Sequence, residues 1–191
     1  MEFKHVSVLL NECIENLNIK PDGVYVDCTM GGAGHSKEIV KRLSAKGRLF
    51  CFDQDINAIN VAKDRLKEYN DRVVLVHSNF ENLKAELESR GIYGIDGVLA
   101  DLGVSSHQLD EADRGFSYMH DARLDMRMDD RASMSAWQVV NEYSQEDLYT
   151  IIKDYGEEKW AKRIAEFIVE ERANHTIDTT FDLVDVIKKA I

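Results

Sequence analysis

The chain has 191 residues, of which 44% are hydrophobic and 31% are charged. A chain of this length can bury about 70% of the surface of its unfolded form, and its composition excludes disordered, collagen-like and fully coiled-coil proteins. With 24 Lys and Arg residues against 35 Asp and Glu residues, the net charge is −11. This charge disfavours nonspecific binding to nucleic acid but allows a local basic surface.

Cysteine usage and hydropathy indicate a cytoplasmic protein. Cys13, Cys28 and Cys51 are widely spaced among apolar residues, which is typical of reduced thiols rather than of disulfides or a zinc site, and we expect no metal. The early apolar run, Val6 with 8–10, is too short for a signal sequence or a membrane span.

The first hundred residues alternate between strand-like and helix-like patterns. Runs of β-branched and aromatic residues predict strands over 24–28, 48–52, 73–77 and 97–102. Amphipathic stretches predict helices over 36–43, 55–69 and 79–90. Asp55 is placed to cap the second of these helices. Strands and helices that alternate in this way form crossover units, so we expect an α/β fold with a parallel sheet.

Strand patterns disappear in the second half of the chain. Helices are predicted over 134–143, from a capping box at 144–147 to near Gly156, over 157–172 and over 180–191. The apolar spacing turns Trp160 and Phe181 towards the buried sides of the last two helices. We therefore expect an α/β part, residues 1–107, and a helical part, residues 108–191. The last pattern has no stop signal, which favours a truncated chain over a complete protein with a helical tail.

A glycine-rich turn follows the first predicted strand. Its sequence is Asp27-Cys-Thr-Met-Gly-Gly-Ala-Gly-His-Ser36. Glycines allow positive φ and let a ligand approach the backbone, and a helix N-terminus presents free amides, so the turn suits a nucleotide. The dinucleotide fingerprint is only half met because Lys37 replaces its third small residue, which disfavours NAD. A glycine-rich turn without a ligand stays open as an alternative.

Further candidate residues follow the second and third predicted strands. Asp53 lies 19 residues beyond Gly34, at a strand end where a carboxylate can accept both ribose hydroxyls of an adenosine. The glycine-rich turn and Asp53 together indicate an adenosine site more specifically than either feature alone. Phe80 follows the third strand, where its ring suits an adenine face, although an aromatic residue there is more often part of a core.

The fourth predicted strand leads into Asp101-Leu-Gly-Val-Ser-Ser106. Ligands of open parallel sheets bind beyond the carboxyl ends of the strands, so Asp101 should face the same crevice as the glycine-rich turn. A capped turn explains the composition of this segment but not its alignment with the two other strand ends. Ser105 and Ser106 lack the elbow motif of a hydrolase nucleophile.

Arginines and aromatic residues occur together in the region that follows. The segments Arg114-Gly-Phe-Ser-Tyr118 and Leu124-Asp-Met-Arg-Met128 suit phosphates and unstacked bases. Acidic residues outnumber arginines between residues 110 and 131, so composition alone favours a salt-bridged linker. We expect any RNA contact to be confined to residues 114–131 and to residues that this chain lacks, with a weak salt dependence.

Six segments together resemble one bacterial enzyme family. They are His5-Val-Ser-Val-Leu-Leu-Asn-Glu12, Tyr25–Ser36, Asp101–Ser106, Arg114–Tyr118, Leu124–Met128 and Tyr155-Gly-Glu-Glu158. In combination they are similar to the family that uses S-adenosylmethionine to methylate the N4 amino group of a cytosine in small-subunit (16S) ribosomal RNA, near the decoding site. The resemblance covers the whole chain. It implies a class I methyltransferase (Rossmann-like) sheet with a helical insertion after the fourth strand, whose closing strands are absent from this chain.

The resemblance also implies a set of site residues. By motif, the contacts to S-adenosylmethionine fall on Ala33, Gly34, His35, Asp53, Phe80, Asp101 and Gln108, the last two near the methionine end. The α/β part would hold the cofactor and its product S-adenosylhomocysteine, and the helical part would recognise the small-subunit RNA or the ribosomal subunit. No membrane partner is implied, and the oligomeric state stays open, a homodimer included.

The expected mechanism is a direct in-line transfer of the methyl group to the cytosine amino nitrogen. The lone pair of this nitrogen is delocalised into the ring, so the site must orient the reacting atoms, which can contribute about 7 to 11 kcal/mol. Asp101 is the candidate catalytic acceptor of a hydrogen bond from the amino group, and the base must leave its stack. Two other functions stay open: a nicotinamide-dependent oxidoreductase that uses the same turn and Asp53, and a noncatalytic RNA-binding module.

Overall fold

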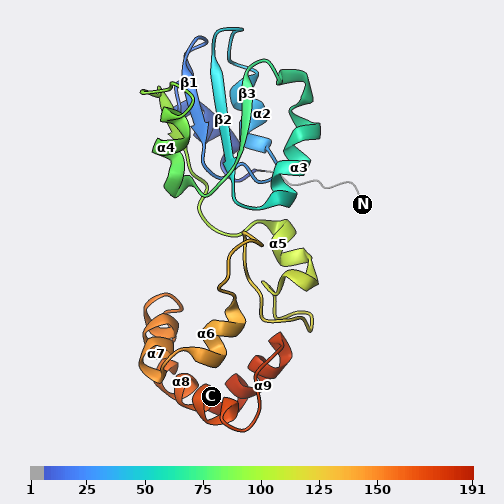
Figure 1. The fold of residues 1–191 in the computed structure, drawn as a ribbon, viewed down its shortest axis with the longest axis vertical. Helices are drawn as coiled ribbons and strands as arrows, with labels where there is room; N and C mark the ends of the chain where they lie inside the picture. The colour runs from blue at the N-terminus through green and yellow to red at the C-terminus, as the bar shows by residue number, and fades with distance from the viewer. Residues whose placement is uncertain (1–6) are drawn as a thin grey trace. The chain divides into compact units, whose positions relative to one another are not determined.

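A computed structural model describes residues 7–191. His5 and Val6, at the start of the first family segment, lie outside the described residues. The chain divides into two compact units (Figure 1). The first, here called the sheet unit, runs to Gly103 and includes Met128–Asp130, and the second, the helical unit, comprises Val104–Arg127 and Arg131–Ile191.

The sheet unit contains four parallel strands in the order β3-β2-β1-β4. The strands are β1 (Val24–Asp27), β2 (Arg48–Asp53), β3 (Val73–His77) and β4 (Gly97–Leu99). The predicted α/β class with a parallel sheet is confirmed. The fourth strand is shorter than predicted because its ladder with β1 stops where Asp27 pairs with Leu99.

Short helices connect these strands. They are α1 (Leu10–Asn16), α2 (Gly34–Val40), α3 (Ile56–Arg65), the 3-10 helices η1 (Lys67–Tyr69) and η2 (Phe80–Asn82), and α4 (Leu83–Glu88). The helix predicted over 55–69 is divided into α3 and η1, and the helix predicted over 79–90 into η2 and α4. Asp55 caps α3 as expected, since its carboxylate accepts the backbone N–H of Asn57 at 2.9 Å. Helix α1 was not predicted.

The central strands β1 and β2 are buried on both faces of the sheet, whereas Val98 of the edge strand β4 is 52% exposed. On one face, Tyr25, Leu49 and Cys51 pack with apolar residues of α1, α2 and α3. On the other face, alternate residues of the same strands, with Val76 of β3, pack with Leu87 of α4. Figure 1 shows α3 and α4 on opposite sides of the strands. Strands buried on both faces contain nearly continuous apolar runs, which explains why the sequence pattern located them well.

The helical unit has its own core. Its helices are α5 (Ser106–Asp110), the 3-10 helix η3 (Ala112–Arg114), α6 (Ala136–Glu142), α7 (Gln145–Asp154), α8 (Ala161–Arg172) and α9 (Thr180–Ala190). Leu148, Ile164 and Ile177 are among the buried residues at its centre. Within the described residues, no helix is both long enough and apolar enough to cross a membrane.

Three local predictions for the helical unit are wrong in detail. The hydroxyl of Ser144 accepts the N–H of Asp147 at 3.1 Å and donates to its carboxylate at 2.6 Å, so only half of the capping box forms. Trp160 is 45% exposed because α8 begins one residue later, after Glu157 adopts a positive φ of 51° that interrupts the helix. Phe181 is 45% exposed in the first turn of α9 rather than buried.

Candidate functional site

The glycine-rich loop between β1 and α2 contains two residues with positive φ. Gly31 has a φ of 49°, and Ala33, which directly precedes α2, has a φ of 62°. This left-handed conformation is unfavourable for alanine, so the surrounding contacts must hold it. A Cβ atom at Gly34 would overlap the hydroxyl of Ser7, but this hydroxyl ends a side chain that can rotate away, so the contact does not by itself require glycine. The strain of the loop therefore lies at Ala33.

Asp53, at the end of β2, holds the glycine-rich loop through its side chain. Its Oδ2 accepts the backbone N–H of Gly31 at 2.8 Å, and its Oδ1 accepts the N–H of Asp55 at 2.9 Å. Burial raises the pKa of the Asp53 carboxyl above its ordinary value, while these N–H groups oppose the rise. Each carboxylate oxygen has a second lone pair, so Asp53 can still accept hydrogen bonds from a ligand.

A second carboxylate, Asp27, lies fully buried behind the loop. It accepts the backbone N–H of Thr29 at 3.1 Å and the hydroxyl of Ser36 at 2.6 Å. Burial raises the pKa of the Asp27 carboxyl. Because its two donors stand at the start of the loop and in α2, Asp27 ties the ends of the loop together. Sequence reasoning missed this role, although an acidic residue in an otherwise apolar strand was a usable signal.

The loops that follow β1 and β4 are joined by hydrogen bonds. The hydroxyl of Thr29 accepts the backbone N–H of Asp101 at 2.6 Å, and Cys28 donates to the carbonyl of Leu99 at 2.8 Å. Together with the bond between Asp53 and Gly31, these contacts bring the ends of β1, β2 and β4 together. The Asp101 residue is exposed, and its carboxylate has no hydrogen-bonding or ionic partner among residues 7–191.

The end of β3 carries an exposed aromatic ring beside a polar network. Phe80 opens η2 and is 42% exposed, so it is not a core residue. The backbone carbonyl of Gln54 lies 3.1 Å from Nε2 of His77. The side-chain amide of Gln54 accepts a hydrogen bond from Asn79 at 2.8 Å and donates one to the sulfur of Met128 at 3.2 Å. The network links the ends of β2 and β3. Sequence reasoning did not find Gln54 or Asn79, since neither stands in a recognisable motif.

Besides Asp53, two of the predicted cofactor contacts have side chains with other partners. His35 is 6% exposed, and its Nε2 lies 3.1 Å from the carbonyl of Val8, so its backbone is the part that a ligand could reach. Gln108 belongs to the helical unit and is also 6% exposed. Its Oε1 accepts the N–H of Ser105 at 3.0 Å in the capping box of α5. The assignment of Gln108 to the cofactor stays a prediction.

Two arginines in the family segments serve the helical unit itself. Arg127 contacts Asp125 through Nε at 3.0 Å and through Nη2 at 2.6 Å, and it also donates to the carbonyl of Ala132 at 2.9 Å. Arg114 donates to the carbonyl of Arg127 at 2.9 Å. The Arg127 guanidinium lowers the pKa of the Asp125 carboxyl. The structure therefore favours the salt-bridged interpretation for Arg127, whereas the contacts described for Arg114 are to a backbone carbonyl and to the ring of Phe116.

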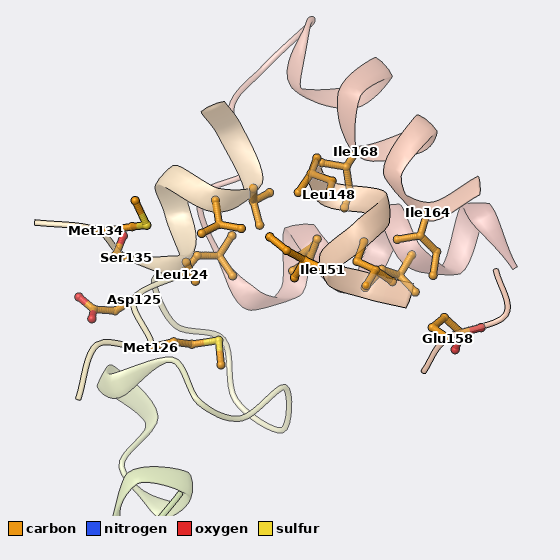
Figure 2. Close-up of a pocket in the computed structure, with 16 residues that line it drawn as sticks. Leu124, Asp125, Met126, Met134, Ser135, Leu148, Ile151, Glu158, Ile164 and Ile168 are labelled. Carbon is orange, nitrogen blue, oxygen red and sulfur yellow. The ribbon is translucent and has the colours of Figure 1, made fainter. Parts of the chain in front are cut away.

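An apolar cavity of about 590 Å³ lies within the helical unit (Figure 2). Leucine, isoleucine, valine and methionine side chains form most of its lining. Asp125, Ser135 and Glu158 are the polar side chains among the labelled residues of Figure 2. A cofactor site needs several convergent polar groups, so the strand ends of the sheet unit are the better candidate.

The strand ends have the arrangement that is typical of α/β nucleotide-binding proteins. A glycine-rich loop, a carboxylate at the next strand end and an exposed ring at the third stand at one edge of an open parallel sheet, where such proteins bind their ligands. A family model described as the MraW methylase family matches residues 2–191. The chain belongs to this family.

Curated relatives agree with the family assignment. The chain is 76% identical over 191 residues to the ribosomal RNA small subunit methyltransferase H of Clostridioides difficile (strain 630). It is 60% identical over 191 residues to the protein of the same name from Finegoldia magna. Each match covers 100% of this chain and 61% of the relative. The chain thus spans about 61% of the length of the relatives that it matches.

Proposed function

We propose that this chain forms the cofactor-binding region and part of the RNA-binding region of a methyltransferase that uses S-adenosylmethionine. Its proposed product is a cytosine methylated at N4 in small-subunit (16S) ribosomal RNA, near the decoding site. The observation that carries the proposal is the junction of three strand ends through the Asp53–Gly31 and Thr29–Asp101 hydrogen bonds. The names of the relatives support the RNA substrate, and the resemblance of the six family segments supports the N4 position.

The residues at the strand ends fit an adenosine-containing cofactor. When bound, S-adenosylmethionine supplies an electrophilic methyl group. Asp53 would accept hydrogen bonds from the ribose hydroxyls through its remaining lone pairs, and the exposed ring of Phe80 would contact the adenine. Residues 31–34 are glycines and one alanine, so the ligand can approach the backbone of Ala33 and Gly34 closely. His35 contributes its backbone to the same surface.

Asp101 is the proposed catalytic residue. Its exposed carboxylate accepts a hydrogen bond from the cytosine amino group and orients the nitrogen as it becomes tetrahedral, which lowers the barrier by positioning. Gln108 is assigned to the methionine end of the cofactor on the resemblance of its segment. The helical unit is assigned to RNA recognition, and the target base must leave its stack to reach Asp101.

A tritiated methyl-transfer assay tests the proposed function. The chain and a longer form that matches the full relatives are compared on naked small-subunit RNA and on assembled subunits, and the labelled nucleoside is identified by mass spectrometry after nuclease digestion. We expect N4-methylcytidine. Asp101→Ala should lose transfer at saturating cofactor, and undiminished turnover would remove Asp101 from the mechanism.

The two other functions give different results. Calorimetry should detect binding of S-adenosylhomocysteine and none of NAD; the reverse result would favour an oxidoreductase. Binding of S-adenosylhomocysteine with no methyl transfer by either form would favour a noncatalytic RNA-binding module.

A further inference from the structure

Thr29 stands between the two loops of the proposed active site. Its backbone N–H donates to the buried carboxylate of Asp27 at 3.1 Å, so the residue is anchored on the sheet side. Its hydroxyl accepts the backbone N–H of Asp101 at 2.6 Å on the other side. Thr29 therefore connects a fully buried carboxylate with the first residue of an exposed loop.

The loop that begins at Asp101 has little else to hold it. Leu102 is 72% exposed, and Gly103 has a φ of 144°, a conformation open to glycine but not to most residues. Within residues 7–191, the Thr29 contact is the only hydrogen bond made by residues 100–104. The last ladder contact before this loop is the bond from Cys28 to Leu99. The direction of the Asp101 backbone thus depends on one hydroxyl group.

We propose that Thr29 is a positioning residue for Asp101: its hydroxyl fixes the backbone of the loop after β4 and thereby the direction of the Asp101 carboxylate. This inference rests on the proposed role of Asp101 in methyl transfer. Thr29 itself touches neither reacting atom. It acts because a carboxylate that accepts a hydrogen bond from the substrate must be held in place before the reaction.

Replacement of Thr29 separates positioning from cofactor binding. Thr29→Val keeps the shape of the side chain but cannot accept the Asp101 N–H, whereas Thr29→Ser keeps the acceptor. Losing one hydrogen bond of ordinary strength should lower kcat about fivefold to tenfold. The affinity for S-adenosylhomocysteine should fall by a smaller factor than kcat, because the Asp53–Gly31 contact is intact and only the Asp101 end of the proposed cofactor site is disturbed.

The experiment measures three quantities on wild type, Thr29→Val, Thr29→Ser and the control Ser89→Ala. Ser89 is an exposed residue at the C-terminal end of α4 whose hydroxyl donates to the carbonyl of Glu86 at 2.9 Å, and it is not one of the proposed site residues. The quantities are the hydrogen-exchange rate of the Asp101 amide by NMR, the affinity for S-adenosylhomocysteine by calorimetry, and kcat at saturating cofactor. We expect faster exchange and lower kcat in Thr29→Val alone, with rescue by serine.

Other results would overturn the inference. Wild-type exchange of the Asp101 amide in Thr29→Val would show that the hydroxyl does not restrain the loop. An equal fall in affinity and kcat would show that Thr29 supports the whole site rather than Asp101. Thr29→Ala replaces the valine variant if that variant does not fold. A wild-type chain that fails to bind S-adenosylhomocysteine would refute the proposed function, while the exchange rates would still decide whether Thr29 restrains the loop.

Discussion

The carboxylate of Asp53 accepts the backbone N–H of Gly31 at 2.8 Å. The residue proposed to hold the ribose therefore also holds the loop proposed to lie against the rest of the cofactor. Ala33 has a left-handed conformation in this loop. The loop can keep its shape because Gly31, two residues earlier, is held by the hydrogen bond to Asp53 at the end of β2. One substitution at Asp53 should therefore affect both the loop and the proposed ribose contact.

Asp53→Asn should weaken the binding of S-adenosylhomocysteine about 10-fold to 100-fold, since hydrogen bonds to a charged group are among the stronger ones. Calorimetry on the 191-residue chain measures this change. The matched control is Asp64→Asn, because Asp64 is an exposed residue of α3. Equal affinity of the Asp53 variant and wild type would exclude Asp53 from the cofactor site.

Asp27 should make the stability of the chain depend on pH in a particular direction. Burial raises the pKa of this carboxyl in the folded protein above its ordinary value of 3.8. The folded state then binds the proton more tightly than the unfolded state, so this contribution falls as the pH rises from about 4 through the folded pKa. Urea unfolding of wild type and Asp27→Asn at several pH values measures it.

The difference in unfolding free energy, wild type minus Asp27→Asn, should decline with rising pH and then level off. A difference that grows with rising pH would contradict the raised pKa. Asp22→Asn serves as the control, because Asp22 is exposed.

The sequence predicted the sheet better than the ends of its elements. The central strands were found because residues such as Tyr25 and Val26 are buried on opposite faces and leave a continuous apolar run. The end of β4 was predicted too far along the chain. The ladder stops where the partner strand β1 ends, and no residue type at 100–102 indicates this point. Trp160 was wrongly predicted to lie on the buried side of its helix. The helix is interrupted at Glu157 by a positive φ, and the spacing of apolar residues does not reveal such backbone geometry.

The site could be predicted in part. Strand order alone brings Asp53 and Asp101 to the edge that carries the glycine-rich loop, so their residue types and positions were sufficient. The contacts that shape this edge use backbone N–H groups, which every residue except proline carries and which no motif marks. The roles of Thr29 and Asp27 therefore became visible only in three dimensions.

Arg127→Met should destabilise the helical unit by about 1 kcal/mol at pH 7, because it removes a paired contact to Asp125 that is only partly screened by solvent. The Arg127 guanidinium lowers the pKa of the Asp125 carboxyl below its ordinary value of 3.8, so this stability is present above that value and is lost as the pH falls through the folded pKa. Denaturant unfolding at pH 7 and below pH 4 measures both effects.

The control for this pair is Arg163→Met, since the Arg163 guanidinium lies over the ring of Phe167 rather than beside a carboxylate. Its effect should not depend on pH in the acidic range. An Arg127→Met cost that stays constant down to the lowest pH would show that the contact to Asp125 is not its source.

Ile177→Ala should lower the unfolding free energy by about 2 to 5 kcal/mol, because Ile177 is fully buried in the core of the helical unit and the smaller side chain leaves a cavity. Ile191→Ala provides a control of the same residue type, since Ile191 is 66% exposed. Thermal unfolding of both variants measures the difference. Equal effects would mean that Ile177 is not a core residue.

A titration of the isotope-labelled chain with S-adenosylhomocysteine, followed by NMR, tests the central claim most directly. We expect saturable shifts at the amides of Ala33, Gly34, His35, Asp53, Phe80 and Asp101, with none at α7 or α8. Shifts confined to residues that line the apolar cavity of the helical unit, or no saturable shifts at all, would contradict it.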